Sequence, residues 1–179
     1  WFVALVTLAT RFCQRQIMQL TSSAFKNGDI LDAAFTVEGE DISPPLAWSA
    51  APSETKSFAI ICDDPDAPSA LRPGPDPWVH WILFNIPPAM RMLPRGVSQE
   101  PEPDAIPGAR QGLNSWPDEN IGYRGPAPPP GSGPHRYFFK LYALDLILPL
   151  TAGTTKSQLL TAMEAHILAE CQLFGIYER

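Results

Sequence analysis

The amino-acid sequence predicts a mostly β protein, a sandwich with a terminal helix packed on it, and three observations support this fold class. The chain holds 21 prolines in 179 residues, which suits short strands joined by shaped loops better than a helical bundle. Three apolar runs have the length of strands. Clear helical periodicity is confined to the end of the chain.

Five segments are predicted as strands: residues 35–39, 45–49, 56–62, 78–86 and 135–144. The run 56–62 is continuously apolar, as expected for a strand that is covered on both faces. It stops before Pro65 and Pro68, because proline donates no hydrogen bond to a sheet. The stretch 94–134 is rich in Gly, Pro and Asn and is expected to pack as shaped loops.

The terminal helix is predicted from apolar residues that recur at spacings of three and four, namely Leu160, Met163, Ile167 and Cys171. Ser157 is the expected N-cap and Gly175 the expected stop. On this helix His166 lies four residues before Glu170, so the two side chains are expected to pair.

Composition and charge are those of a single globular domain. With 45% hydrophobic and 18% charged residues, the chain can bury a sizeable core and is unlike a disordered protein. A formal net charge of -6 leaves no general basic surface for a phosphate backbone, which argues against nucleic acid as a partner. Cys13, Cys62 and Cys171 are odd in number and widely spaced, which favours a reduced, cytoplasmic protein.

Residues 1–17 differ from the rest of the chain. They begin with a ten-residue apolar run, WFVALVTLAT, which is too short to span a bilayer, for which about 20 residues are needed. One interpretation is the remnant of a signal peptide, which would place the protein in the periplasm. The more ordinary one is an extension upstream of a start at Met18, so we expect the folded domain to cover residues 18–179.

Three carboxylates follow the apolar run 56–62 directly, at Asp63, Asp64 and Asp66. Because Asp and Pro are common turn residues, a simple turn explains this segment. A functional interpretation also holds. The apolar strand should bring at least one aspartate to the edge of the core, where a carboxylate must find partners.

His80 lies within the apolar strand 78–86. Alternation along a strand places it on one face with Trp78, Ile82 and Phe84. One interpretation is a structural histidine that is satisfied by a backbone carbonyl. The other is a site residue whose second nitrogen is served by an aspartate from a neighbouring strand end.

The segment 125–139 reads GPAPPPGSGPHRYFF and has two interpretations. Its composition is typical of a linker or of a proline-rich ligand for another domain, but it runs directly into a strand. On that strand His135 and Tyr137 share a face with Phe139 and Leu141. Because they lie at the start of the strand, they can point into a cavity with an apolar floor.

These side chains together suit a small anion. Imidazole and phenol groups donate hydrogen bonds, and nearby glycines let backbone N–H groups approach a ligand. A carboxylate would repel the anion unless it accepts a hydrogen bond from a histidine or is itself protonated. The expected role of Asp64 is to orient and charge an imidazole. The candidates, each at the end of a strand, are Asp64, His80, His135 and Tyr137.

These motifs resemble those of the phosphatidylethanolamine-binding proteins, also called Raf kinase inhibitor-like proteins, and are most similar to the bacterial branch of the family. The resemblance runs from Met18 almost to Arg179. It rests on SPPLAWS (43–49), DDPDAP (63–68), WVHWILFNIP (78–87), GYRGPAPPPGSGPHRYFFKLYALD (122–145) and HILAECQLFGIYER (166–179). It implies a sandwich of two antiparallel sheets with a C-terminal helix, long Pro/Gly-rich loops and a pocket for phosphate or phosphorylated head groups. The pocket residues that it implies are Asp64, Pro68, His80, Gly125, Ala127, Pro129, His135 and Tyr137.

The resemblance implies no catalytic activity and no metal or other cofactor. The leading hypothesis is therefore a non-enzymatic module that binds a small phosphate-like anion and modulates a protein partner such as a kinase or a protease. Two alternatives stay open. The Asp, His and His of the same site would also serve a metal-assisted or acid–base hydrolase, and residues 126–130 would serve as a proline-rich ligand independent of the pocket. The sequence also leaves a homodimer open.

Overall fold

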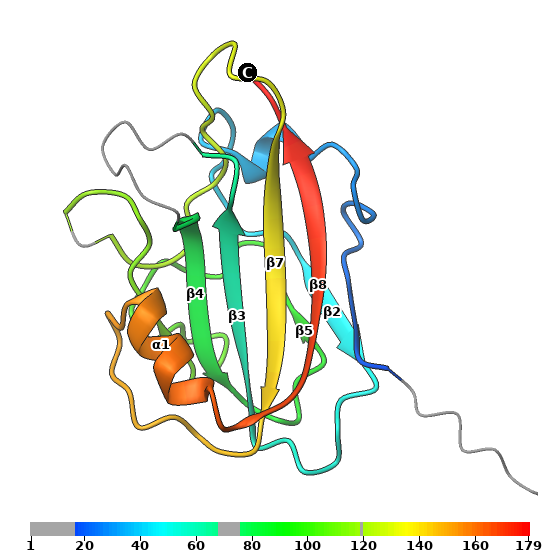
Figure 1. Ribbon diagram of the computed structural model, residues 1–179, viewed down its shortest axis with the longest axis vertical. Helices are drawn as coiled ribbons and strands as arrows, with labels where there is room; N and C mark the ends of the chain where they lie inside the picture. Colours follow the sequence, from blue (N-terminus) through cyan, green and yellow to red (C-terminus); the bar gives the residue numbers. More distant parts are fainter. Residues whose placement is uncertain (1–16, 68–75, 119) are drawn as a thin grey trace, which may run out of the picture.

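The structure, a computed structural model, describes residues 17–67, 76–118 and 120–179. Within these ranges the chain forms two antiparallel sheets and one α-helix (Figure 1), which confirms the predicted fold class. In chain order the elements are β1 (Gln19–Thr21), η1 (Ala33–Phe35), β2 (Leu46–Ser49), β3 (Ser57–Asp64), β4 (Trp78–Ile86), β5 (Met92–Leu93), β6 (Arg110–Gln111), β7 (His135–Leu144), α1 (Lys156–Met163) and β8 (Ile167–Tyr177). The expected domain, 18–179, stays a prediction, because nearly all of the extension lies outside the described residues.

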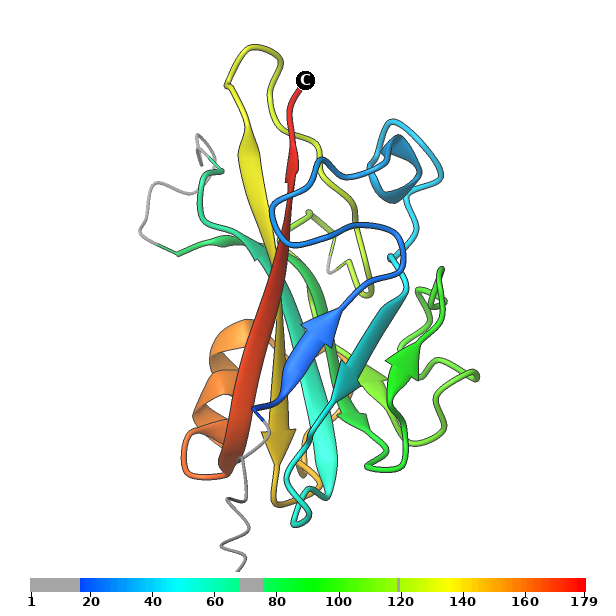
Figure 2. The same cartoon turned by 90° about the vertical axis from the view of Figure 1, so that its right-hand side faces the viewer.

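The larger sheet has the strand order β6-β4-β3-β7-β8 and the smaller one the order β1-β2-β5. Figure 2 shows the smaller sheet on one face of the larger sheet and α1 on the opposite face. We call these the inner face and the outer face of the larger sheet. The protein therefore has a core on each side of its central strands.

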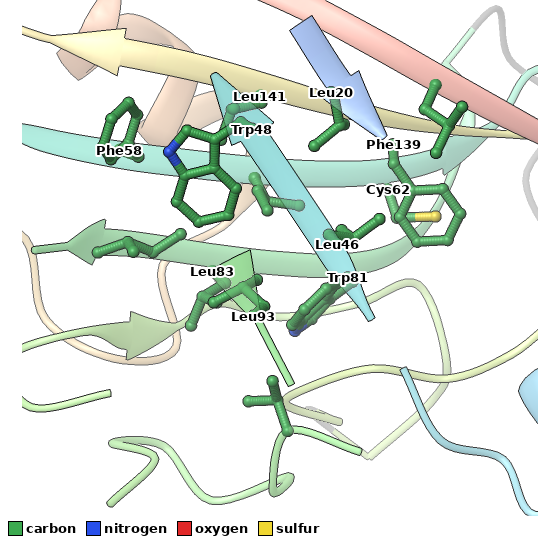
Figure 3. Packing of buried hydrophobic residues seen from close by; sticks show 14 of the residues in the cluster. Leu20, Leu46, Trp48, Phe58, Cys62, Trp81, Leu83, Leu93, Phe139 and Leu141 are labelled. Carbon is green, nitrogen blue, oxygen red and sulfur yellow. The ribbon is translucent and has the colours of Figure 1, made fainter. Parts of the chain in front are cut away.

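The inner core fills the space between the two sheets (Figure 3). Trp48 from the smaller sheet packs edge-on against Phe58 of the larger one, with ring centroids 5.2 Å apart. Along β7, alternate residues from Tyr137 to Ala143 point into this core, including Phe139 and Leu141. The predicted face shared by Tyr137, Phe139 and Leu141 is thus confirmed.

The outer core lies beneath α1. Leu159 and Met163 on this helix belong to the same buried cluster as Ile61 of β3 and Ile82 of β4. The helix begins at a capping box, in which Thr155 and Gln158 exchange hydrogen bonds between side chain and backbone. The N-cap is therefore Thr155, two residues before the predicted Ser157.

Strand β3 lies between β4 and β7 and is buried at all eight positions. Both faces are covered, as its continuous apolar sequence predicts. The strand continues to Asp64, two residues beyond its predicted end at Cys62, because Asp63 and Asp64 still pair with Val79 and Trp78. This extension carries two carboxylates into buried positions.

The predicted strand 35–39 is wrong. Residues Ala33–Phe35 form a short 3-10 helix, in which the Asp32 side chain accepts a hydrogen bond from Ala34 N. Thr36 ends it by donating from both its N–H and its hydroxyl to Ala33 O. Local side-chain hydrogen bonds at Asp32 and Thr36 favour the turn over an extended strand.

The predicted extent of the terminal helix is also wrong. The helix ends at Met163, and β8 follows from Ile167 to Tyr177, so that Gly175 lies in a strand. Residues 169, 171 and 173 contact the inner core. This segment of the sequence therefore shows the alternation of a strand as well as the spacing of a helix. Pairing with the whole length of β7 favours the strand. His166 consequently pairs with Asp145, at 2.8 Å, and not with Glu170.

The stretch 94–134 packs as shaped loops, as predicted. Its buried centre is Gln111, whose side-chain oxygen accepts a hydrogen bond from Trp81 Nε1 at 2.6 Å. The amide nitrogen of Gln111 donates to the carbonyls of Ser98 and Glu100, each at 2.7 Å. These bonds connect the loops to the inner core.

Candidate functional site

Polar side chains gather at one end of the larger sheet, where β3 and β8 end and β4 and β7 begin (Figure 1). Four of them are buried, with exposed fractions between 1% and 3%: Asp64, His80, His135 and Tyr137. We call these four residues the polar cluster. The structure thus brings together the four candidates, which come from the ends of three strands, β3, β4 and β7.

Asp64 and His135 form the centre of the polar cluster. Asp64 Oδ2 accepts a hydrogen bond from His135 Nδ1 at 2.8 Å, and Asp64 Oδ1 accepts one from Asp66 N at 2.7 Å. Burial raises the pKa of the Asp64 carboxyl, and the hydrogen bond from His135 opposes this rise. Asp64 therefore orients the imidazole, and the same carboxylate also closes a turn.

The other two carboxylates of this segment have different partners. Asp63 points to the outer face, where its fully buried carboxylate contacts Lys140 and Lys156. Asp66 pairs with the side chain of Arg136 through two hydrogen bonds of 2.8 Å, and this pairing lowers the pKa of Asp66. Of the three aspartates, only Asp64 belongs to the polar cluster.

His80 reaches the polar cluster through a β-bulge in β4. Cys62 pairs with Trp81, but the next residue, Asp63, pairs with Val79, so His80 is the extra residue of the bulge. The predicted face shared by His80, Ile82 and Phe84 is therefore wrong, because the bulge reverses the alternation and leaves Ile82 and Phe84 in the outer core. Bulges commonly redirect a side chain in this way.

Aromatic rings pack against the imidazole of His80, and one of its ring nitrogens has a polar partner. Its ring meets Trp116 and Tyr137 edge to face, with centroids 4.9 and 5.0 Å away. Its Nδ1 lies 2.7 Å from the carbonyl oxygen of Arg124. Burial lowers the pKa of His80 to about 4, so the imidazole is neutral at physiological pH.

Tyr137 presents a buried hydroxyl that has no hydrogen-bond partner in the described parts of the chain. Burial, followed by the negative charge of Asp64, raises the pKa of this phenol, so the hydroxyl remains a hydrogen-bond donor. Buried polar groups are nearly always paired. Within the described residues, the Tyr137 hydroxyl is therefore an unused donor on a ring that packs against His80.

Ser132 is a site residue that sequence reasoning missed. Its hydroxyl lies 3.0 Å from His135 Nε2, the nitrogen that does not contact Asp64. Ser132 is exposed, whereas His135 is buried. A serine three residues before a histidine gives no signal on its own, because the contact depends on the turn that Ser132 N closes with Pro129 O.

The loop residues among the candidates differ in their placement. Gly125 is buried, and its N–H donates to Asp41 Oδ1 at 2.7 Å. Ala127 is half-buried and Pro129 is exposed. Pro68 lies outside the described residues. That these residues and the polar cluster bind a ligand stays a prediction.

Asp41 is far from the polar cluster in sequence, but it contacts Gly125 and Arg124, and Arg124 contacts His80. One of its oxygens accepts from Gly125 N, and the other lies 3.1 Å from Arg124 Nε. Arg124 in turn exchanges backbone contacts with His80, since its N–H donates to His80 O and its carbonyl accepts from the ring. No sequence pattern connects residues 41, 80 and 124, so this support was not predictable.

Two further properties concern residues 17–67, 76–118 and 120–179 only. No group of three or more His, Cys, Asp or Glu side chains is arranged to hold a metal ion. None of the helices is long and apolar enough to cross a membrane.

The buried His80 makes stability depend on pH. Its pKa is about 4 in the folded protein and about 6.5 in an unfolded chain, so the unfolded state binds more protons between these values. The free energy of unfolding is therefore full above pH 6.5 and falls as the pH approaches 4, by about 3 kcal/mol from this residue. Urea unfolding of the wild type and of His80→Gln across this range measures the difference. Parallel pH profiles for the two proteins would contradict the expectation.

Comparisons with known proteins support the family resemblance and the fold. Residues 21–178 match the family profile described as phosphatidylethanolamine-binding protein. A UPF0098 protein from Methanothermobacter thermautotrophicus is 47% identical over 163 residues, which cover 90% of this chain and 99% of that relative. The crystal structure of CT736 from Chlamydia trachomatis has a TM-score of 0.80 at 42% identity and covers 91% of this chain and 98% of its own. YbcL from E. coli has a TM-score of 0.80 at 32% identity, with coverages of 92% and 99%.

Proposed function

The chain belongs to the phosphatidylethanolamine-binding protein family, and from this premise we propose that its polar cluster binds a small phosphate-like anion without catalysing a reaction. Family membership supports ligand binding in general. The observation that carries the proposal is the buried Tyr137 hydroxyl, a donor without a partner in the described residues. It lies within the same cluster as His80 and His135.

The charges of the polar cluster are consistent with an anion. Asp64 alone would repel it, but its carboxylate already accepts hydrogen bonds from His135 Nδ1 and Asp66 N. When His135 is protonated, the Asp64–His135 pair is neutral, and Nε2 becomes a charged donor toward a ligand. The proposal therefore places the anion between Tyr137 and the Nε2 side of His135, with the loop of Gly125, Ala127 and Pro129 beside it.

The surface around the polar cluster is the part that we propose for a protein partner, such as a kinase or a protease. A role of residues 126–130 as an extended proline-rich ligand is less well supported. Pro126 and Pro128 are buried, and Pro126 O accepts a hydrogen bond from Val37 N. A proline-rich ligand needs its prolines free to enter an aromatic groove.

Titration calorimetry with inorganic phosphate tests the proposal. Affinity is expected to rise as the pH falls from 8 to 5.5, the range in which histidines commonly gain charge. His135→Ala is expected to weaken binding at pH 5.5 by about tenfold or more, because a charge-assisted hydrogen bond is lost. His166→Ala is the matched control, since His166 pairs with Asp145 away from the cluster. Equal affinities at both pH values, unchanged in His135→Ala, would refute anion binding at this site.

A further inference from the structure

Ser132, His135 and Asp64 form a continuous line of hydrogen bonds. Ser132 Oγ lies 3.0 Å from His135 Nε2, and His135 Nδ1 lies 2.8 Å from Asp64 Oδ2. The serine belongs to the loop before β7, the histidine is the first residue of β7, and the aspartate is the last residue of β3. A hydroxyl, an imidazole and a carboxylate in this order form the arrangement that activates a serine for acyl transfer on several unrelated folds.

The hydrogen-bond partners define where the protons lie along this line. Asp64 Oδ1 accepts from Asp66 N, and Oδ2 faces the ring of His135. Because a carboxylate only accepts, Nδ1 carries the proton of the neutral imidazole, and Nε2 has a lone pair. The Ser132 hydroxyl then donates to Nε2. This is the direction in which a serine passes on its proton when it attacks a carbonyl carbon.

The loop that carries Ser132 is held by its own backbone. Ser132 N donates to Pro129 O at 3.1 Å, and Gly131 N donates to Arg179 O at 2.9 Å. The second bond connects the loop to the C-terminus of the chain, which lies beside it (Figure 1). The position of the hydroxyl next to the imidazole is therefore fixed by contacts other than the hydroxyl itself.

The hydroxyl is accessible, whereas the groups behind it are not. Ser132 is exposed, but the exposed fractions of His135 and Asp64 are 3% and 2%. The glycines on either side, Gly131 and Gly133, have φ values of +77° and +83°. Apart from their chain neighbours, no heavy atom of the described residues lies within 4 Å of a β-carbon position on either glycine. A small molecule can therefore approach the serine from the solvent.

We propose that Ser132 is a nucleophile that accepts an acyl group from activated carboxylic esters. Its Oγ attacks the carbonyl carbon and passes its proton to His135 Nε2, while Asp64 stabilises the charged imidazole. The bond from the carbonyl carbon to the leaving oxygen then breaks, and the leaving alcohol takes the proton from Nε2. The products are an ester at Ser132 and a free alcohol, so no further reactant is needed. This reaction goes beyond the proposed anion binding, in which no covalent bond forms.

The reaction of the full chain with p-nitrophenyl acetate at pH 8 tests the proposal. The expected result is one acetyl group per chain, located at Ser132 by peptide mass spectrometry, with a burst of p-nitrophenol equal to the amount of protein. Ser132→Ala is expected to lose both signals. Ser157→Ala is the matched control and is expected to keep both, since Ser157 is also exposed but lies on α1. Acetyl groups on other residues, with Ser132 unmodified, would overturn the proposal.

Two further variants test the roles of His135 and Asp64. His135→Gln is expected to slow the acetylation of Ser132 at least about a hundredfold, the usual contribution of a general base. In Asp64→Asn the amide oxygen continues to accept from Asp66 N, so the amide N–H faces Nδ1. The ring proton then moves to Nε2, which can no longer accept from the serine, and a comparable loss is expected. Equal rates in the wild type and His135→Gln would show that the serine is not activated. If a variant does not fold, mapping of the wild type and Ser132→Ala still decides the matter.

The pH profile distinguishes a general base from a structural histidine. Neutral imidazole is the reactive form, so the rate is expected to rise from pH 5.5 to 8, the range in which histidines commonly lose charge. The titratable groups that face His135 include Asp64 at the end of β3, Asp66 in the following turn, His80 on β4 and Tyr177 on β8. A rate at Ser132 that does not change over this range would contradict the role of His135.

Inorganic phosphate separates this reaction from the proposed anion binding. Both need His135 Nε2, so phosphate is expected to slow the acetylation of Ser132, and more strongly at pH 5.5 than at pH 8. If Ser132 is acetylated and phosphate gives no protection, the nucleophile is confirmed and the anion does not bind at Nε2. If phosphate binds but Ser132 does not react, anion binding stands and the nucleophile is wrong.

Discussion

Replacing both lysines beside Asp63 with methionine is expected to destabilise the protein by about 3–5 kcal/mol, the usual cost of leaving a buried charge without its partners. Asp63 is fully buried, and its oxygens lie 2.8 Å from Lys140 Nζ and 2.5 Å from Lys156 Nζ. Lys140 comes from β7 and Lys156 from the first turn of α1. The three residues therefore join the helix to the sheet through one carboxylate.

Urea unfolding of the double variant Lys140→Met/Lys156→Met measures this loss. Lys26→Met is the control, since Lys26 is exposed and its change should leave the free energy of unfolding within about 0.5 kcal/mol. Adding Asp63→Leu to the double variant is expected to recover most of the stability, because hydrophobic residues of similar volume often replace a buried ion pair without cost. A triple variant as unstable as the double one would show that the loss comes from packing and not from the unpaired charge.

Gly125→Ala is expected to lower the free energy of unfolding by about 1–3 kcal/mol, as overpacking does, and to weaken anion binding. A β-carbon at residue 125 would lie 2.3 Å from Phe35 O and 2.7 Å from Thr36 Cα. Both atoms are backbone, so one chain segment must move. The N–H of Gly125 would then move away from Asp41, and the neighbouring carbonyl of Arg124 away from His80.

Thermal unfolding and phosphate titration of Gly125→Ala check the two effects separately. Gly108→Ala is the matched control. Apart from its two chain neighbours, no heavy atom of the described residues lies within 4 Å of its β-carbon position, although its φ of +88° makes an alanine there strained. It is expected to lose about 1–2 kcal/mol of stability and to keep its affinity for phosphate. Unchanged affinity in a folded Gly125→Ala would mean that the backbone of this loop does not shape the site.

The long strands were predictable because their own sequences define them. Residues 78–86 are mostly apolar and lie between Pro77 and Pro87, and residues 135–144 are rich in apolar and aromatic side chains and follow Pro134. The two ranges match β4 and β7. The end of the chain was not predictable in the same way. Residues 167–177 fit both a helical and an alternating pattern, and only pairing with β7 decides between them. The short strands β5 and β6, of two residues each, are too brief to leave a pattern.

The four residues of the polar cluster were predictable, but its geometry and its contact with Ser132 were not. Asp64, His80, His135 and Tyr137 lie at strand ends, and antiparallel pairing brings those ends together. The bulge at His80 and the contact of Ser132 with His135 depend on backbone pairing and on loop shape. Neither the bulge nor the Ser132 contact produces a repeating pattern in the sequence. Asp41 contributes through a contact with Gly125, 84 residues away.

The bulge in β4 has a consequence for how such a site is gained or lost in evolution. Val79, before the extra residue, packs in the outer core, and Trp81, after it, packs in the inner core. Deleting His80 would therefore remove the imidazole and leave Val79 and Trp81 in the alternation of a regular strand, each on the side that it now occupies. The loss of one residue would thus dismantle the polar cluster without changing any residue of the two cores. Substitutions at the same positions change the chemistry but leave the phase intact.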